Sequence, residues 1–428
     1  MRPPYSLYLH IPFCRHRCAY CDFNTYGGQE ESLPAFVEAL CHELEFIRQN
    51  ASEKLSLHTV FFGGGTPSLL TPRQFESILR TITDNFVLTD PEVTIEANPG
   101  TVSFPTLKDL HSLGINRISF GVQSANPFEL RMLERAHSYF DVINAVTWAR
   151  KAGFDNLNLD LIYGLPLQTL EVWSATVKLI LGLNPEHLSL YALTLEHGTP
   201  FGRWSTRGLM PLPDPDLAAD MYEWAGETLE AAGFQQYEIS NWAIDEESQT
   251  GDQSSSTVYR PPSRACTHNL QYWRGLPYLA AGAGAHGYAD GYRYSNVLRI
   301  KTYIDRLAGE PCEGSKPSQG LSFPLTPVTV NHHRQTLQDD MSEFMLNGLR
   351  LTREGVSASV FRERFGRDLK EVFGKEIEDL VRLGLLEWID FPLPSADKQR
   401  EAPQRGMRVR LTRRGRLLGN QAFMRFVQ

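Results

Sequence analysis

Three cysteines, Cys14, Cys18 and Cys21, lie within eight residues near the start of the chain, in the stretch HIPFCRHRCAYCDF. An odd number of thiols cannot pair off, and six cysteines in 428 residues are too few for a disulfide framework. Thiolates at positions i, i+4 and i+7 can wrap a short loop around one [4Fe–4S] cluster, each holding one iron. The fourth iron then stays open to a small molecule. The spacing therefore predicts an iron–sulfur centre with one exchangeable position.

A zinc site is the second interpretation of these cysteines. His10, His16 or Asp22 would complete the four ligands that zinc commonly takes. Structural zinc sites usually gather their ligands as two separated pairs, and the three bunched cysteines do not follow that pattern. We therefore favour the cluster.

The composition is that of an ordinary globular protein of a reducing compartment. Hydrophobic residues make up 42% of the chain, and the length allows two or three domains. The sequence has no run of about 18 apolar residues, and its start lacks the apolar core of a secretory signal. We therefore expect a cytoplasmic protein without a membrane span, whose contact with a membrane, if any, is peripheral. The net charge of −8 argues against nucleic acid as a partner.

Six short β-rich runs alternate with amphipathic stretches. Strand followed by helix, repeated, specifies a parallel sheet with right-handed crossovers. Six units are too few for a complete eight-stranded barrel, and a Rossmann-like sheet is disfavoured because no G-x-G-x-x-G follows the first run. We predict an α/β fold with a six-stranded partial (β/α)6 barrel. The runs are SLYLHI (6–11), HTVFFG (58–63), EVTIEA (92–97), RISFGV (117–122), NLNLDLI (156–162) and HLSLYAL (187–193).

The pattern changes after the sixth run, and this change sets the expected domain borders. The barrel is expected over 1–244, followed at 245–310 by a polar, Ser-rich insertion and a segment packed on the barrel. A proline-containing irregular linker is expected at 311–335. The helical periods and the hairpin-like end of 336–428 predict a small α+β domain of winged-helix character.

Polar residues gather where the predicted strands end. The first strand leads to Cys14, the second ends in GGGTP (63–67), and Glu96, Gln123 and Asp160 belong to the next three. In a parallel barrel the carboxyl ends of the strands meet at one edge, where active sites form. Glycine at the second strand end lets bare backbone approach a ligand. These positions predict one shared binding site.

The spacing C-x3-C-x2-C, with Tyr20 before the last cysteine, resembles the signature of radical-SAM enzymes. More of the chain resembles the oxygen-independent coproporphyrinogen III oxidases and their paralogues, the HemW-type heme chaperones, through YLHIPFC, FFGGGTPSLL, IEANPG, RISFGVQS and NLDLIYGLP. The resemblance implies a [4Fe–4S] cluster on the three cysteines, with S-adenosylmethionine (SAM) on its open iron. It places nine residues around SAM, the last three of which match contacts to a second SAM in the oxidases: Tyr8, Tyr20, Gly64, Gly65, Thr66, Glu96, Gln123, Arg135 and Asp160.

Three features favour the chaperone branch of this family. The oxidases carry a further cysteine two residues after the third, whereas Asp22 and Phe23 follow here. The oxidases also have an N-terminal extension, and only thirteen residues precede Cys14. Finally, HNLQYW matches an H-N-x-x-Y-W motif that the resemblance associates with heme. It offers an imidazole for iron and aromatic surface for a porphyrin through His268, Asn269, Tyr272 and Trp273.

The resemblance thus implies a protein that binds heme and passes it to an acceptor protein. An electron donor such as a flavodoxin or ferredoxin would deliver electrons to the cluster. The alternative is an oxidase that converts coproporphyrinogen III propionates to vinyls, and a third hypothesis, nucleic-acid binding by the basic C-terminal tail, is opposed by the net charge. The sequence assigns no catalytic residue and leaves open whether the chain is an enzyme.

Overall fold

The computed structural model describes residues 4–246, 259–308, 321–392 and 405–427. The chain forms two compact units. The first unit consists of Met1–Tyr222 and Pro277–Arg334, and the second consists of Glu223–Leu276 and Gln335–Gln428. Most of the predicted polar insertion and part of the predicted linker lie outside the described residues, and the borders expected from the sequence remain predictions.

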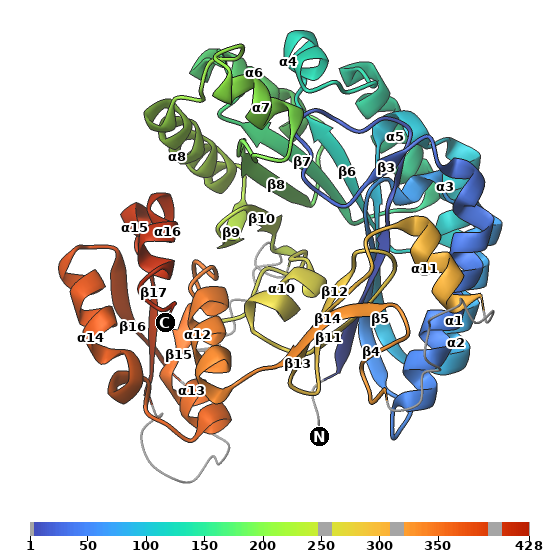
Figure 1. Cartoon of the computed structure of the whole chain (residues 1–428). Coiled ribbons are helices and arrows are strands. Elements are labelled where there is room, and N and C mark those ends of the chain that lie inside the picture. Colours follow the sequence, from blue (N-terminus) through green and yellow to red (C-terminus); the bar gives the residue numbers. More distant parts are fainter. Residues whose placement is uncertain (1–3, 247–258, 309–320, 393–404, 428) are drawn as a thin grey trace. The chain divides into compact units, whose positions relative to one another are not determined.

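The six predicted strands form the centre of the first unit, which confirms the partial barrel (Figure 1). They pair in parallel in the order β1, β4, β5, β6, β7, β8. Helices connect them, as a β–α repeat requires. The strands are β1 (Tyr5–Ile11), β4 (Ser56–Gly64), β5 (Val87–Ala97), β6 (Arg117–Gln123), β7 (Leu157–Tyr163) and β8 (His187–Ala192). The helices are α1 (Leu33–Asn50), α2 (Pro72–Asn85), α3 (Phe104–Ser112), α4 (Pro127–Met132), α5 (Tyr139–Ala152), α6 (Leu170–Leu181) and α7 (Pro200–Thr206).

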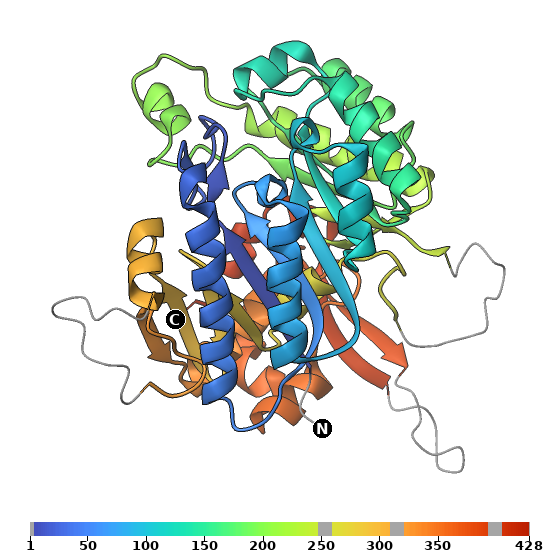
Figure 2. The same ribbon diagram turned by 90° about the vertical axis from the view of Figure 1, so that its right-hand side faces the viewer.

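Inward and outward positions alternate along these strands. Leu7 and Leu9 of β1 are fully buried, whereas Tyr8 between them keeps part of its surface exposed. The outward side chains pack on helices: the rings of Phe62 in β4 and Phe75 in α2 lie 5.1 Å apart. Figure 2 shows these helices in front of the strands. The partly exposed side chains, such as that of Tyr8, therefore lie on the opposite, inner face of the sheet.

The sheet continues beyond the predicted strands on the other side of β1. There β11 (Tyr278–Ala281) pairs with β1 in parallel, and β12 (His286–Ala289), β13 (Tyr292–Asn296) and β14 (Thr329–Arg334) follow antiparallel. The sequence did not predict these strands, because β11 and β12 are only four residues long and flank the glycine-rich turn GAGA. α11 (Ile300–Leu307) follows β13.

The second unit contains a winged-helix arrangement, as predicted. After α8 (Pro215–Ala231), which leads into this unit, come the antiparallel pair β9 (Phe234–Glu238) and β10 (Asn241–Ile244), then α10 (Thr267–Trp273). The remainder follows the order helix, strand, two helices and a hairpin, with a three-stranded sheet β15-β17-β16. These elements are α12 (Leu337–Gly348), β15 (Val356–Ser357), α13 (Ala358–Phe365), α14 (Leu369–Arg382), β16 (Leu386–Pro392), β17 (Arg405–Leu411), α15 (Arg413–Leu417) and α16 (Gly419–Phe423).

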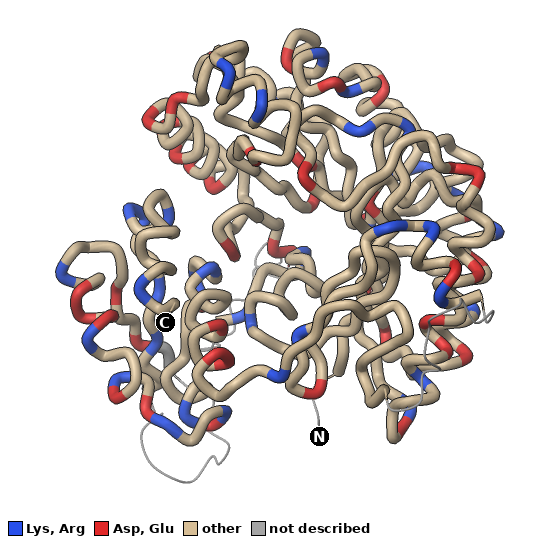
Figure 3. Tube along the Cα trace, viewed as in Figure 1, with Lys and Arg blue, Asp and Glu red and all other residues tan. Residues whose placement is uncertain are grey.

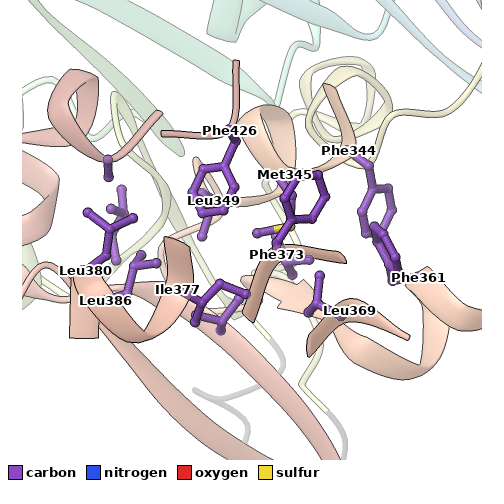
Figure 4. Close-up of a cluster of buried hydrophobic side chains, with 14 of the residues drawn as sticks. Phe344, Met345, Leu349, Phe361, Leu369, Phe373, Ile377, Leu380, Leu386 and Phe426 are labelled. Atoms are coloured by element: carbon purple, nitrogen blue, oxygen red, sulfur yellow. The ribbon is translucent and has the colours of Figure 1, made fainter. Parts of the chain in front are cut away.

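A continuous apolar core holds the winged-helix part together (Figure 4). Met345, Leu349 and Phe373 are fully buried in it, together with Phe426 near the end of the chain. The rings of Phe373 and Phe426 meet edge to face, 5.5 Å apart. The C-terminal segment is thus part of the core of this unit.

Charged positions of the first unit lie mostly on its outer helices and loops, with few along the strands (Figure 3). None of the helices in the described ranges has both the length and the apolar content needed to cross a membrane. Among the charged residues on the strands are Glu96 and Asp160, which belong to the candidate site.

Candidate functional site

The three cysteines lie on a loop that begins at the end of β1. Two short strands, β2 (Phe13–Cys14) and β3 (Tyr26–Gly27), pair in parallel and close this loop at its base. Inside it, the Cys21 amide donates to the Cys18 carbonyl over 3.1 Å. All three thiols are free, and no disulfide joins them. The loop therefore presents three sulfur ligands at the carboxyl end of the first barrel strand.

The chemistry of the three thiols fits an iron–sulfur cluster. Burial, and then the neighbouring cysteines, raise the pKa of Cys14, while a hydrogen bond from the Thr66 hydroxyl at 3.6 Å lowers it. Burial also raises the pKa of Cys21. Bound iron opposes these effects, because it stabilises thiolates. Within the described ranges, no three His, Cys, Asp or Glu residues are placed to hold a single metal ion.

The glycines at the end of β4 pack beneath this loop. The amide of Gly65 donates to the Ile11 carbonyl over 2.9 Å, and that of Thr66 to the Phe13 carbonyl over 2.7 Å. A Cβ on Gly65 would lie 2.6 Å from the Phe13 oxygen and 2.8 Å from the Ile11 oxygen. Glycine is thus required here because backbone approaches backbone. The amide of Gly64 donates to the Glu96 carboxylate over 3.0 Å.

Two carboxyl groups of neighbouring parts of the sheet, Glu96 on β5 and Asp160 on β7, influence each other electrostatically. Burial, then the charge of Asp160, raises the pKa of Glu96 to about 7, while the Gly64 amide and the Arg117 charge oppose this. The pKa of Asp160 is also raised, mainly by burial. Its oxygens accept from Ser119 at 2.9 Å and Asn158 at 2.7 Å. Glu96 and Asp160 both keep part of their surface exposed, so a ligand can reach them.

Tyr8 closes this group on the side of β1. Its ring stacks with that of Phe61, and its hydroxyl bonds to Nδ1 of His10 over 2.9 Å. A Cβ on Gly63 would lie 3.0 Å from the Tyr8 ring and 3.2 Å from a Glu96 oxygen. Tyr8, Gly63 and Glu96 therefore meet at one point, with no room for a larger side chain at position 63.

Arg135 connects the cysteine loop to β6. Its guanidinium donates to the Gly121 carbonyl over 2.5 Å and to the Cys18 sulfur over 3.8 Å. Burial lowers the pKa of Arg135, but the neighbouring Tyr20 and Cys18 raise it by more. Its Nε is buried without a hydrogen-bond partner. Gln123, at the end of β6, has a φ of 69°, a strained conformation for a side-chain-bearing residue. An unpaired donor and a strained backbone are typical of a site that awaits a ligand.

Several of the nine residues predicted for SAM are linked by contacts: Gly64 bonds to Glu96, Thr66 to Cys14 and Arg135 to Cys18. All nine keep part of their surface exposed. The sequence suggested their neighbour His10 only as a zinc ligand. Its position two residues after Tyr8, on the same face of the first strand, could have indicated that it belongs to this site. Arg117 on β6, fully buried beside the two carboxyl groups, was missed as well. The available signal was the pair Arg117 and Ser119, polar residues at alternate positions of RISFGV.

The HNLQYW segment forms α10 and belongs to the second unit. His268 is 1% exposed, and its Nε2 lies 2.8 Å from the Tyr272 hydroxyl, one helical turn along. The Trp273 ring stacks under the guanidinium of Arg350, 4.3 Å from its centre, and the Trp273 Nε1 is buried without a hydrogen-bond partner. These polar and aromatic groups therefore share one half-buried helix, while Asn269 lies on the same helix with part of its surface exposed.

Comparisons with known proteins agree with this architecture. The profile of the radical SAM superfamily matches residues 8–180, and that of the HemN C-terminal domain matches residues 335–390. The chain is 37% identical over 427 residues to a protein named heme chaperone HemW from Bacillus subtilis, covering 99% of both chains. It is 33% identical to the protein of that name from Lactococcus lactis, covering 100% of this chain and 98% of the relative.

Two further relatives extend the comparison. Radical S-adenosyl methionine domain-containing protein 1, mitochondrial, from Danio rerio is 35% identical over 377 residues, which cover 86% of this chain and 78% of that one. The solved structure of coproporphyrinogen III oxidase (HemN) from Escherichia coli superimposes with a TM-score of 0.76 at 23% identity, over 99% of this chain and 90% of that one. The oxidase therefore shares the fold.

Proposed function

The chain belongs to the HemW family of heme chaperones, and on that premise we propose that it binds heme and passes it to an acceptor protein. The observation that carries the proposal is the end-to-end match to relatives of that name, at 37% identity over 427 residues. The radical SAM domain implies a [4Fe–4S] cluster and SAM. The acceptor protein, the cytoplasmic location and an electron donor of the flavodoxin or ferredoxin type are part of the same proposal.

The cysteine loop would hold the cluster through Cys14, Cys18 and Cys21. SAM would be held beside the cluster by the nine residues described above. When bound, the pair supplies one-electron cleavage of a sulfonium. The residues of this chain bind and orient the ligand. The Glu96 carboxylate is anionic above its pKa of about 7 and can then accept a hydrogen bond from a donor group of the ligand. Arg135 stays charged beside Cys18.

Heme would be held by α10 of the second unit, with the His268 imidazole offered to its iron. Trp273 and Tyr272 would supply aromatic surface and Asn269 a polar side chain. Because His268 Nε2 is engaged by the Tyr272 hydroxyl at 2.8 Å, ligation through this nitrogen requires that hydrogen bond to be given up. The segment must therefore open locally before iron can bind at Nε2.

The proposal is tested by two assays on anaerobically reconstituted protein. We expect heme to bind at about one per chain, and His268→Ala to weaken binding roughly 10- to 100-fold, as loss of ordered metal-site groups does elsewhere. His286→Ala is the matched control, because that histidine is exposed on β12 of the first unit. The second assay measures turnover of coproporphyrinogen III. Protoporphyrinogen formation without heme uptake would assign the chain to the oxidases and contradict the proposal.

A further inference from the structure

Glu43 of α1 is a fully buried carboxylate in the first unit that none of the site residues above contacts directly. It is 0% exposed, yet its oxygens accept four hydrogen bonds. The donors are the Gly282 amide at 2.8 Å, Asn296 Nδ2 at 2.8 Å, the Tyr303 hydroxyl at 2.5 Å and the Thr326 hydroxyl at 3.1 Å. All four donors are neutral, and such a saturated shell is what allows a charge to be buried without a cation.

These donors come from separate parts of the first unit. Gly282 follows β11, Asn296 ends β13, Tyr303 belongs to α11 and Thr326 precedes β14. They lie between 239 and 283 residues from Glu43 along the chain. One side chain on the first helix therefore holds the strands that extend the sheet beyond β1.

The Gly282 turn in turn holds the base of the cysteine loop. Gly282 has a φ of 104°, and a Cβ there would overlap the carbonyl oxygen of His10. Asn24 Nδ2 donates to the carbonyls of Ala283 and Leu298 over 3.0 Å each. His10 Nε2 donates to the Asn24 carbonyl over 2.9 Å, which leaves Nδ1 to accept from Tyr8. The turn thus contacts both ends of the loop that bears the cysteines.

We propose that Glu43 is a positioning residue for the SAM site: through the Gly282 turn, it fixes His10, Tyr8 and Asn24, and so the loop that carries the cysteines. This inference rests on the proposed function, because it presumes SAM at the strand ends. Glutamine at position 43 would keep the shape of the side chain but replace one acceptor oxygen with a donor. That NH2 group would face a donor already present, so the turn would move away from α1 and release His10 and Asn24.

The test compares Glu43→Gln with Glu38→Gln, a control on an exposed position of the same helix. The first readout is SAM affinity, taken from the change that SAM causes in the electron paramagnetic resonance signal of the reduced cluster. We expect one cluster per chain in both variants. We expect SAM affinity to fall roughly tenfold in Glu43→Gln only, the lower end of what is lost when a group that orients a metal site is changed. The second readout is amide hydrogen exchange of the cluster-free protein, which should quicken at residues 282–285 and 10–24.

The outcomes separate the two proposals. A wild-type protein whose cluster signal ignores SAM overturns the proposed cofactor binding and the positioning role with it. A responding wild type with an equally responsive Glu43→Gln overturns the positioning role alone, even if the variant melts earlier. If Glu43→Gln does not fold, Tyr303→Phe takes its place, because it removes one donor and keeps the ring that packs on Phe36 at 5.2 Å. An unchanged SAM affinity in that variant counts against the role in the same way.

Discussion

At the strand ends of the first unit, polar side chains keep part of their surface exposed, whereas His268 in the second unit is 1% exposed. The first region also contains groups whose bonding is incomplete or strained. Arg135 Nε is buried without a partner, and Gln123 adopts a φ of 69°. In the second region, His268 Nε2, the nitrogen proposed to coordinate iron, already forms a hydrogen bond with the Tyr272 hydroxyl.

The two regions differ in how many protein hydrogen bonds must break before a ligand can bind. A site with partly exposed carboxyl groups and an unpaired guanidinium nitrogen gains hydrogen bonds when a ligand enters, so little has to be broken first. A histidine held by an internal hydrogen bond must exchange one bond for another. We therefore expect SAM to bind a largely preformed surface, and heme to bind only after α10 has rearranged.

The largest effect we expect is loss of the cluster from the first region. Replacing Cys14, Cys18 or Cys21 with Ala removes one of three iron ligands, and we expect iron content and cluster absorbance to disappear. Cys41→Ala should retain the full cluster, because Cys41 lies on α1 next to Ser77, away from the loop. The measurement is iron and sulfide per chain after anaerobic reconstitution. Stoichiometric zinc with no iron in anaerobically prepared wild type would show that the loop is a zinc site.

A smaller effect is the pH dependence of SAM binding. The pKa of Glu96 is raised to about 7, so the carboxyl is largely protonated in the free protein at pH 6. A ligand that donates a hydrogen bond to Glu96 favours the anion, and binding then releases a proton. We expect SAM affinity to fall as the pH drops below 7, approaching tenfold per pH unit.

The matched variant for this titration is Glu96→Gln, which should bind SAM more weakly at pH 8 and lose the dependence near pH 7. The same raised pKa makes the folded protein the tighter proton binder, so this group's contribution to the free energy of unfolding decreases as the pH rises from about 4.5 to about 7. If the SAM affinity of the wild type does not change from pH 6 to pH 8, no donor group of SAM forms a hydrogen bond with Glu96.

The sequence predicted the six barrel strands because each is a short β-rich run and helical patterns lie between the runs. It could not predict β11 to β14, since runs of four residues beside glycines carry too little periodicity. Nor could it find Glu43: among the helical residues of α1 it has the pattern of an ordinary glutamate, and its burial depends on donors more than 230 residues away.

The glycines show a second limit of sequence reasoning. Bare backbone in GGGTP correctly indicated a close approach, and the sequence suggested a ligand as the approaching group. In the structure, the space beside Gly65 is filled by the carbonyls of Ile11 and Phe13, while Gly63 is the glycine that faces Tyr8 and Glu96. Composition and spacing identify where backbone must be bare, but only the three-dimensional arrangement shows which atoms come close.

The smallest effect we expect is on heme, and it has the opposite sign to the others. Tyr272→Phe keeps the ring, which meets the His268 ring edge to face at 5.0 Å, and removes only the hydroxyl bonded to Nε2. An intramolecular hydrogen bond contributes about 1 kcal/mol net. Heme should therefore bind roughly fivefold more tightly when iron no longer has to displace the Tyr272 hydroxyl from Nε2. Heme titration followed at the Soret band measures this, with Tyr139→Phe as control, because that hydroxyl bonds to Leu179 in the first unit. Weaker binding with a displaced Soret band in Tyr272→Phe would instead show that the hydroxyl takes part in holding heme, and α10 would then be as preformed for its ligand as the strand ends are for SAM.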